Sequence, residues 1–103
     1  MDDNNRINIE AAAFRALVKH LQYRKDLQNI DLMNLAGFCR NCLAKWLKLA
    51  SEQYSDPVDY DEARNIIYGM PHQEWKEKYQ KETSMEQMEK FKNSQKQHAK
   101  IEL

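Results

Sequence analysis

The sequence predicts a small, compact all-α domain of four to five helices with an amphipathic C-terminal helix or tail. Glycine and proline each occur only twice among 103 residues, so the chain lacks the turn residues that a β-sandwich needs. Apolar residues make up 42% of the chain and charged residues 31%. The apolar residues recur at helical spacing in most segments, and no segment shows a convincing strand pattern.

The first helix is predicted over about residues 8–28. Asn8 is suited to cap it by accepting a backbone N–H bond. Its apolar side chains form one stripe at helical spacing, made of Ile7, Phe14, Leu17, Val18 and Leu21. We expect Arg15, Lys19 and Tyr23 to face away from this stripe.

A short apolar piece over residues 30–35 precedes a helix predicted over residues 36–52, with Gly37 at a bend or a close approach. Asp56-Pro57 is typical of a turn. Asp59 is expected to cap a helix over residues 60–68. Gly69 is suited to end that helix in the left-handed conformation.

Pro71 is expected to open a helix over about residues 71–82. Ser84 followed by Gln87 resembles a capping box. Met85, Met88 and Phe91 then form the apolar stripe of a helix that frays after about Ser94. Residues 1–83 are thus predicted as the helical core, and residues 84–103 as a polar C-terminal helix or tail of the same single domain. The predicted core consists of Phe14, Leu17, Leu21, Cys39, Leu43, Trp46, Ile67 and Trp75.

Charge and hydropathy exclude several classes of function. The formal net charge is zero, so no overall field favours nucleic acid or an anionic membrane, and we expect neither as a partner. No apolar stretch approaches the roughly 20 residues of a membrane span. The acidic, polar N-terminus is unlike a secretory signal, so we expect a cytoplasmic protein with reduced thiols.

Both cysteines lie within residues 37–46, GFCRNCLAKW. On a helical wheel Leu43 and Trp46 fall within about 40° of Cys39. The pattern therefore favours Cys39 and Cys42 as buried core residues. Two alternatives remain: a zinc or iron site made of Cys39, Cys42 and His72, and a thiol-redox pair. His72 is the candidate third ligand because the first turn of a helix favours neutral imidazole.

Arg64 shares a predicted apolar stripe with Tyr60 and Ile67, so it needs a partner if it is buried. A structural ion pair with Glu74 or Asp59 is the simpler interpretation. The alternative is a site for a small anionic ligand or a partner, formed by Arg40, Arg64 and Trp75.

No catalytic residue and no cofactor is predicted, because the sequence has neither a glycine-rich phosphate loop nor a nucleophile motif. Whether the protein is an enzyme stays open, with the balance against it. The leading hypothesis is a non-enzymatic interaction or adaptor protein that acts as a homodimer or with a protein partner.

Two stretches, GFCRNCLAKW (residues 37–46) and YGMPHQEWK (residues 68–76), resemble a family of short bacterial proteins catalogued as domain-of-unknown-function family twelve-forty-four. The resemblance implies a compact all-α domain and, because the family has no assigned activity, no function. In the family pattern the position of His72 is often aromatic, which argues against His72 as a family-wide metal ligand.

Overall fold

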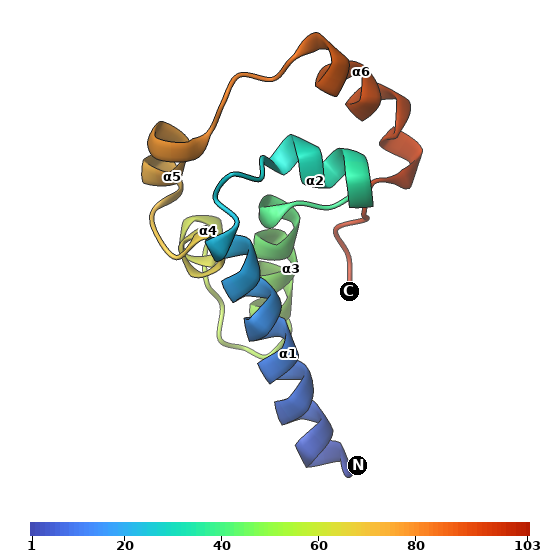
Figure 1. The fold of residues 1–103 in the computed structure, drawn as a ribbon. Helices are drawn as coiled ribbons and strands as arrows, with labels where there is room; N and C mark the ends of the chain where they lie inside the picture. The colour runs from blue at the N-terminus through green and yellow to red at the C-terminus, as the bar shows by residue number, and fades with distance from the viewer.

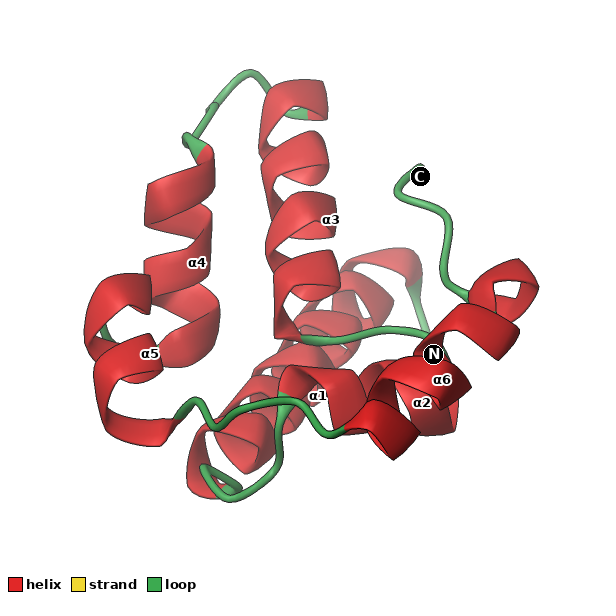
Figure 2. Cartoon of the chain, turned by 90° about the horizontal axis from the view of Figure 1, so that it is seen from above, coloured by secondary structure: helices red, strands yellow, loops and turns green.

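Two helix pairs, α3 with α4 and α2 with α6, organise the chain in the computed structural model, which describes residues 1–103 (Figures 1 and 2). The elements are α1 (Asp3–Tyr23), α2 (Asn29–Ala36), α3 (Arg40–Gln53), α4 (Tyr60–Tyr68), α5 (His72–Tyr79), α6 (Met85–Asn93) and one 3-10 turn, η1 (Gln95–Gln97). The all-α prediction is confirmed, with six helices in place of four to five.

The additional helix is α2, whose core was predicted only as a short apolar piece. The Asp31 carboxylate accepts a hydrogen bond from the Gln28 backbone N–H at 3.1 Å and so fixes the start of α2. Gly37 ends α2 in the left-handed region, at φ 76°. Because Cys39 is then extended, α3 begins at Arg40 instead of residue 36.

Helix α1 begins earlier and ends earlier than predicted. Asp2, and not Asn8, is the N-cap, and its side chain accepts from the Asn5 N–H at 2.8 Å. A carboxylate there also suits the positive end of the helix dipole. The chain leaves the helix after Tyr23 because a turn joins the Leu27 N–H to the Arg24 carbonyl.

The predicted ends of α4 are confirmed. Asp59 accepts from the Glu62 N–H at 2.8 Å, and Gly69 ends the helix at φ 71°. A short connection makes α3 and α4 antiparallel neighbours, which Figure 2 shows side by side.

Helix α5 ends at Tyr79, three residues before its predicted end, because Gln28 holds the next segment extended. The Gln28 side chain donates to the Tyr79 carbonyl at 2.9 Å and accepts from the Lys81 N–H at 2.9 Å. The capping box of Ser84 and Gln87 is confirmed at the start of α6. The last residues then return to Gly37, whose carbonyl accepts from the Ala99 N–H at 2.7 Å.

The buried apolar core consists of Leu21, Leu32, Cys39, Cys42, Leu43, Ala44, Ala63, Ile67, Tyr68 and Trp75. Three residues predicted for it lie further out: Phe14 and Trp46 are partly buried, and Leu17 is 41% exposed. All three line the same open hollow between α1 and α3. The N-terminal half of α1 extends beyond α3 and α4 (Figure 1). None of the helices combines the length and apolar character required to cross a membrane.

Candidate functional site

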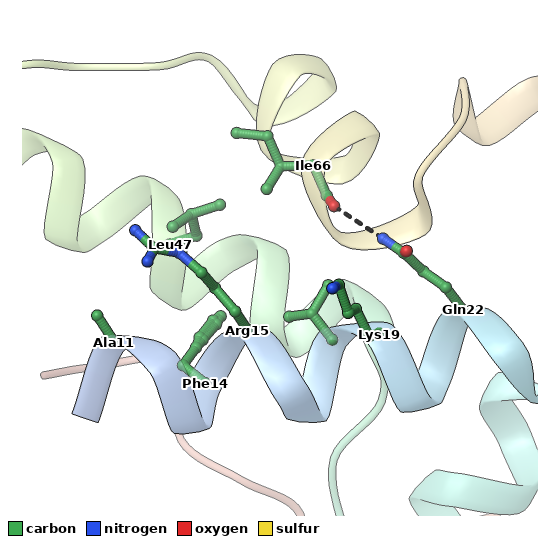
Figure 3. Close-up of a pocket in the computed structure, with 8 residues that line it drawn as sticks. Ala11, Phe14, Arg15, Lys19, Gln22, Leu47 and Ile66 are labelled. Atoms are coloured by element: carbon green, nitrogen blue, oxygen red, sulfur yellow. Dashed lines mark hydrogen bonds between the residues drawn. The ribbon is translucent and has the colours of Figure 1, made fainter. Parts of the chain in front are cut away.

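A groove of about 470 Å³ lies between α1 and the α3–α4 pair. Figure 3 shows α1 along its floor, with Leu47 of α3 and Ile66 of α4 opposite. Gln22 bounds it at the end nearer the C-terminus of α1 by donating to the Ile66 carbonyl at 3.2 Å and to the Ile67 carbonyl at 3.1 Å. The groove is lined by Ala11, Phe14, Arg15, Val18, Lys19, Gln22, Leu47 and Ile66.

A second hollow of about 500 Å³ shares Phe14 and Leu47 with this groove, and only apolar side chains line it. Its lining consists of Phe14, Leu17, Leu43, Trp46, Leu47, Ala50 and Leu103. We call the two hollows together the α1–α3 face. An apolar surface that is continuous on both sides of Phe14 is typical of a protein-binding surface.

The polar edge of the first groove is basic, contrary to prediction. Arg15 and Lys19, expected to face away, both line the groove. The apolar stripe of α1 was identified correctly. However, α3 and α4 pack to one side of that stripe, so the cations beside it, Arg15 and Lys19, border the groove. A basic edge around an apolar floor suits an apolar segment that carries acidic residues.

The N-terminal part of α1 has that composition. Residues 3–10 are all exposed, and Ile7 is 65% exposed. Acidic residues Asp2, Asp3 and Glu10 outnumber the single cation Arg6 there. Ile7 lies on the same side of the helix as Phe14 and Val18, because these positions are seven and eleven residues apart. The apolar stripe therefore runs from the groove along the projecting helix.

The two cysteines lie together in the core, at the N-cap and third position of α3. Their Sγ atoms are 4.0 Å apart, and the residues are 7% and 8% exposed. Burial raises the pKa of the Cys39 thiol, so the neutral form is favoured. No cluster of three or more histidine, cysteine, aspartate or glutamate side chains has a geometry suited to a metal ion.

His72 is engaged elsewhere. Its Nδ1 accepts a hydrogen bond from Arg64 Nη1 at 3.0 Å, and its ring packs edge-on against Tyr68. Burial, together with the neighbouring Arg64 cation, lowers the pKa of His72 and keeps it neutral. The three residues predicted for zinc or iron are therefore divided between two places in the fold.

Arg40 is 1% exposed, and both terminal nitrogens of its guanidinium form hydrogen bonds inside the protein. Nη2 donates to the carbonyls of Leu21 and Arg24, and Nη1 donates to the Leu27 carbonyl and the Asn29 side chain, at 2.7–3.1 Å. These carbonyls lie at the C-terminal end of α1, where backbone acceptors lack helical partners and a cation is favourable. Burial lowers the pKa of Arg40. Arg40 thus joins α1 to α3, and its burial leaves almost none of the side chain open to an anion in solvent.

The other two residues predicted for an anion or a partner are also engaged by other side chains of the protein. Arg64 pairs with Asp61, and not with Glu74 or Asp59, and its guanidinium lies 4.4 Å from the centre of the Tyr60 ring. Arg64 Nε has no hydrogen-bond partner. Trp75 is 2% exposed and stacks beside the Arg40 guanidinium at 4.9 Å.

Sequence reasoning missed a polar network beside Arg40. The Tyr68 hydroxyl donates to Asn41 Oδ1 at 2.6 Å and accepts from Asn29 Nδ2 at 2.9 Å. Burial raises the pKa of Tyr68 to about 12. The only available signal was that Asn41 and Tyr68 both lie in the two quoted motifs.

Comparison with protein families adds one finding. The family model described as "Protein of unknown function (DUF1244)" matches residues 27–93, about two thirds of the chain, so the chain belongs to this family. The resemblance drawn from the two motifs is thereby confirmed. No curated protein matches the sequence.

Proposed function

We propose that this family member is a non-enzymatic interaction protein that works as a homodimer, with α1 of each copy lying on the α1–α3 face of the other. The observation that carries the proposal is the continuous apolar stripe that leads from the groove at Phe14 to the exposed Ile7.

The projecting helix gains from being covered. Its first eight residues are exposed, and a helix without tertiary contacts is only marginally stable in water. Burying one large aliphatic side chain contributes roughly 1.5–3 kcal/mol. A partner over Ile7 would therefore stabilise both the contact and the helix that presents it.

A second copy of this chain would complement the face in apolar character and in charge. The groove offers an apolar floor edged by Arg15 and Lys19, and the N-terminal part of α1 offers Ile7 among acidic residues. A two-fold axis places the same surface of both copies in contact, so each copy supplies one helix and one groove. Complementary charges at the edge would fix the orientation of the two helices.

The test is the mass of the full chain in solution, measured by sedimentation equilibrium over a range of concentrations. Ile7→Glu places a charge on the stripe and is expected to give a monomer. Ile9→Glu is the matched control, because Ile9 lies about 200° around the helix from Ile7 and is also exposed. We expect Ile9→Glu to dimerise like the parent, with equal helix content in all three proteins.

A parent chain that remains monomeric at the highest concentration would refute the homodimer. Equal loss of dimer in both variants would refute the α1–α3 face as the contact. A chain ending at Thr83 separates this contact from one made by α6, whose Met85 is 91% exposed. Loss of dimer in that truncation, with Ile7→Glu still dimeric, would assign the contact to the C-terminal segment instead.

A further inference from the structure

Three sulfur atoms meet where the start of α3 packs against α2. Cys42 Sγ lies 4.0 Å from Cys39 Sγ and 3.9 Å from the Met33 thioether sulfur. Both cysteines are buried, whereas Met33 is only partly buried and packs against the core. The cluster therefore lies at the edge of the core, where the flexible Met33 side chain is partly exposed.

The spacing of these sulfurs fits a shared metal ion. Metal–thiolate bonds are about 2.3 Å long, so two sulfurs about 4 Å apart subtend about 120° at an ion bound to both. Each of the two pairs, Cys42 with Cys39 and Cys42 with Met33, therefore has the separation expected of two ligands at such an ion. Thiolate and thioether ligands together select soft ions, of which Cu(I) is the biological example.

The free thiols are neutral because they are buried, but a cation beside them favours a metal complex that carries negative charge. Arg40 follows Cys39 directly, and its buried guanidinium donates to three backbone carbonyls and one amide oxygen but to no carboxylate. A buried cation without a counter-charge is costly. Two thiolates and one monovalent cation carry a net charge of −1, which would balance Arg40. Cys39 is also the N-cap of α3, where the helix dipole stabilises negative charge.

We propose that Cys39, Cys42 and Met33 form a Cu(I) site, with two thiolates and one thioether as ligands. Binding forms three Cu–S bonds and releases the two thiol protons to solvent, and the metal stays in the +1 state. This ligand set excludes His72, which contacts Arg64 and Tyr68. The proposal is independent of the homodimer, because none of the three residues lines the α1–α3 face.

The experiment is an anaerobic titration of the reduced full chain with Cu(I), supplied as its acetonitrile complex, in competition with bathocuproine disulfonate. We expect one Cu(I) per chain. Met33→Leu keeps the side-chain volume and is expected to weaken binding by about tenfold or more. Met70→Leu is the matched control, since Met70 also packs partly buried against the core, and should bind like the parent.

X-ray absorption of the loaded protein gives a second readout, with three sulfur neighbours expected in the parent and two in Met33→Leu. The proposal is overturned if the chelator keeps all the Cu(I), or if Met33→Leu and the parent bind alike. It is also overturned if Zn(II) displaces Cu(I) at equal concentration. Cys42→Ser should abolish binding; if that variant does not fold, as judged by circular dichroism, Met33→Leu decides the question.

Discussion

Two regions of the molecule are held in place in different ways. One is the end around Arg40, and the other consists of the peripheral segments, residues 3–13 and 94–103. At the Arg40 end, which we define as Leu21, Arg40, Tyr68 and Trp75, every side chain is buried, and the Arg40 guanidinium and the Tyr68 hydroxyl bond to other parts of the chain. The peripheral segments are mostly exposed, and residues 94–103 are tied back chiefly by single hydrogen bonds.

The family match follows the same division. It covers residues 27–93, which include three of the four residues of the Arg40 end and exclude both peripheral segments. Arg40 and Trp75, the motif residues that most suggested a function, are thus buried and pack within the protein. The α1–α3 face combines side chains of α1, outside the matched residues, with side chains of α3 and α4, inside them. The proposed homodimer would therefore use both the matched region and the helix that precedes it.

Replacing Arg40 is expected to have the largest effect on stability. Arg40→Met keeps much of the apolar stem but removes the guanidinium donor from four acceptors in buried or partly buried hydrogen bonds. We expect a loss of about 3–5 kcal/mol in the free energy of unfolding. Arg6→Met is the matched control, because Arg6 is exposed in its pair with Glu10 and should cost under about 1 kcal/mol.

Urea denaturation followed by circular dichroism measures both variants. Comparable costs in the two would mean that water replaces the guanidinium at the end of α1. Side-chain contacts at the Arg40 end would then contribute no more to the free energy of unfolding than those of the projecting helix. The contrast between the two regions would fail.

The two tryptophans compare the regions directly. Trp75 lies at the Arg40 end and is 2% exposed, so Trp75→Ala should cost about 3–5 kcal/mol. Trp46 is partly buried, and its indole N–H donates to the Lys100 carbonyl at 3.1 Å. Trp46→Ala should cost about half as much, because less area leaves water on folding.

Thermal or urea unfolding of the two alanine variants gives the difference. A larger cost for Trp46→Ala than for Trp75→Ala would show that residues 94–103 are packed as firmly as the Arg40 end. The sequence alone had placed both tryptophans in the core, so this pair also tests how far helical spacing predicts burial.

Local chemistry was predictable from sequence because the groups involved lie within a few residues of one another. The caps at Asp59, Gly69 and Ser84 follow from backbone N–H groups two or three positions away or from a required positive φ. Helical spacing likewise predicted burial of Leu43 and Ile67.

The long-range partners were not predictable. Arg40 binds carbonyls 13 to 19 residues earlier, which only the turn after α1 brings into reach. The side on which α3 meets α1 decided that Arg15 borders a groove. Met33 joins the cysteines only because α2 is a separate helix. Each depends on how helices are placed, and a pattern within one helix does not encode that placement.

The two glycines are expected to give the smallest effects and to measure how firmly residues 94–103 are held. Both have positive φ, so alanine at either position costs about 1–2 kcal/mol for the left-handed conformation. At Gly69 an added Cβ meets the Gln22 amide at 3.0 Å, the far end of a long side chain that can shift, which would weaken its hydrogen bonds to the Ile66 and Ile67 carbonyls. Gly69→Ala should therefore cost the conformational term plus the weakening of these two hydrogen bonds.

At Gly37 the added Cβ would clash with the Gln97 backbone oxygen, so the C-terminal segment must move. That movement breaks the bond from the Ala99 N–H to the Gly37 carbonyl and disturbs the one from Trp46 to Lys100. We expect Gly37→Ala to cost about 1 kcal/mol more than Gly69→Ala, with faster hydrogen exchange at Ala99. Equal costs, with exchange at Ala99 already fast in the parent, would mean that residues 94–103 can detach without loss of stability. The Arg40 end and the C-terminal segment would then differ in stability by more than their hydrogen bonds indicate.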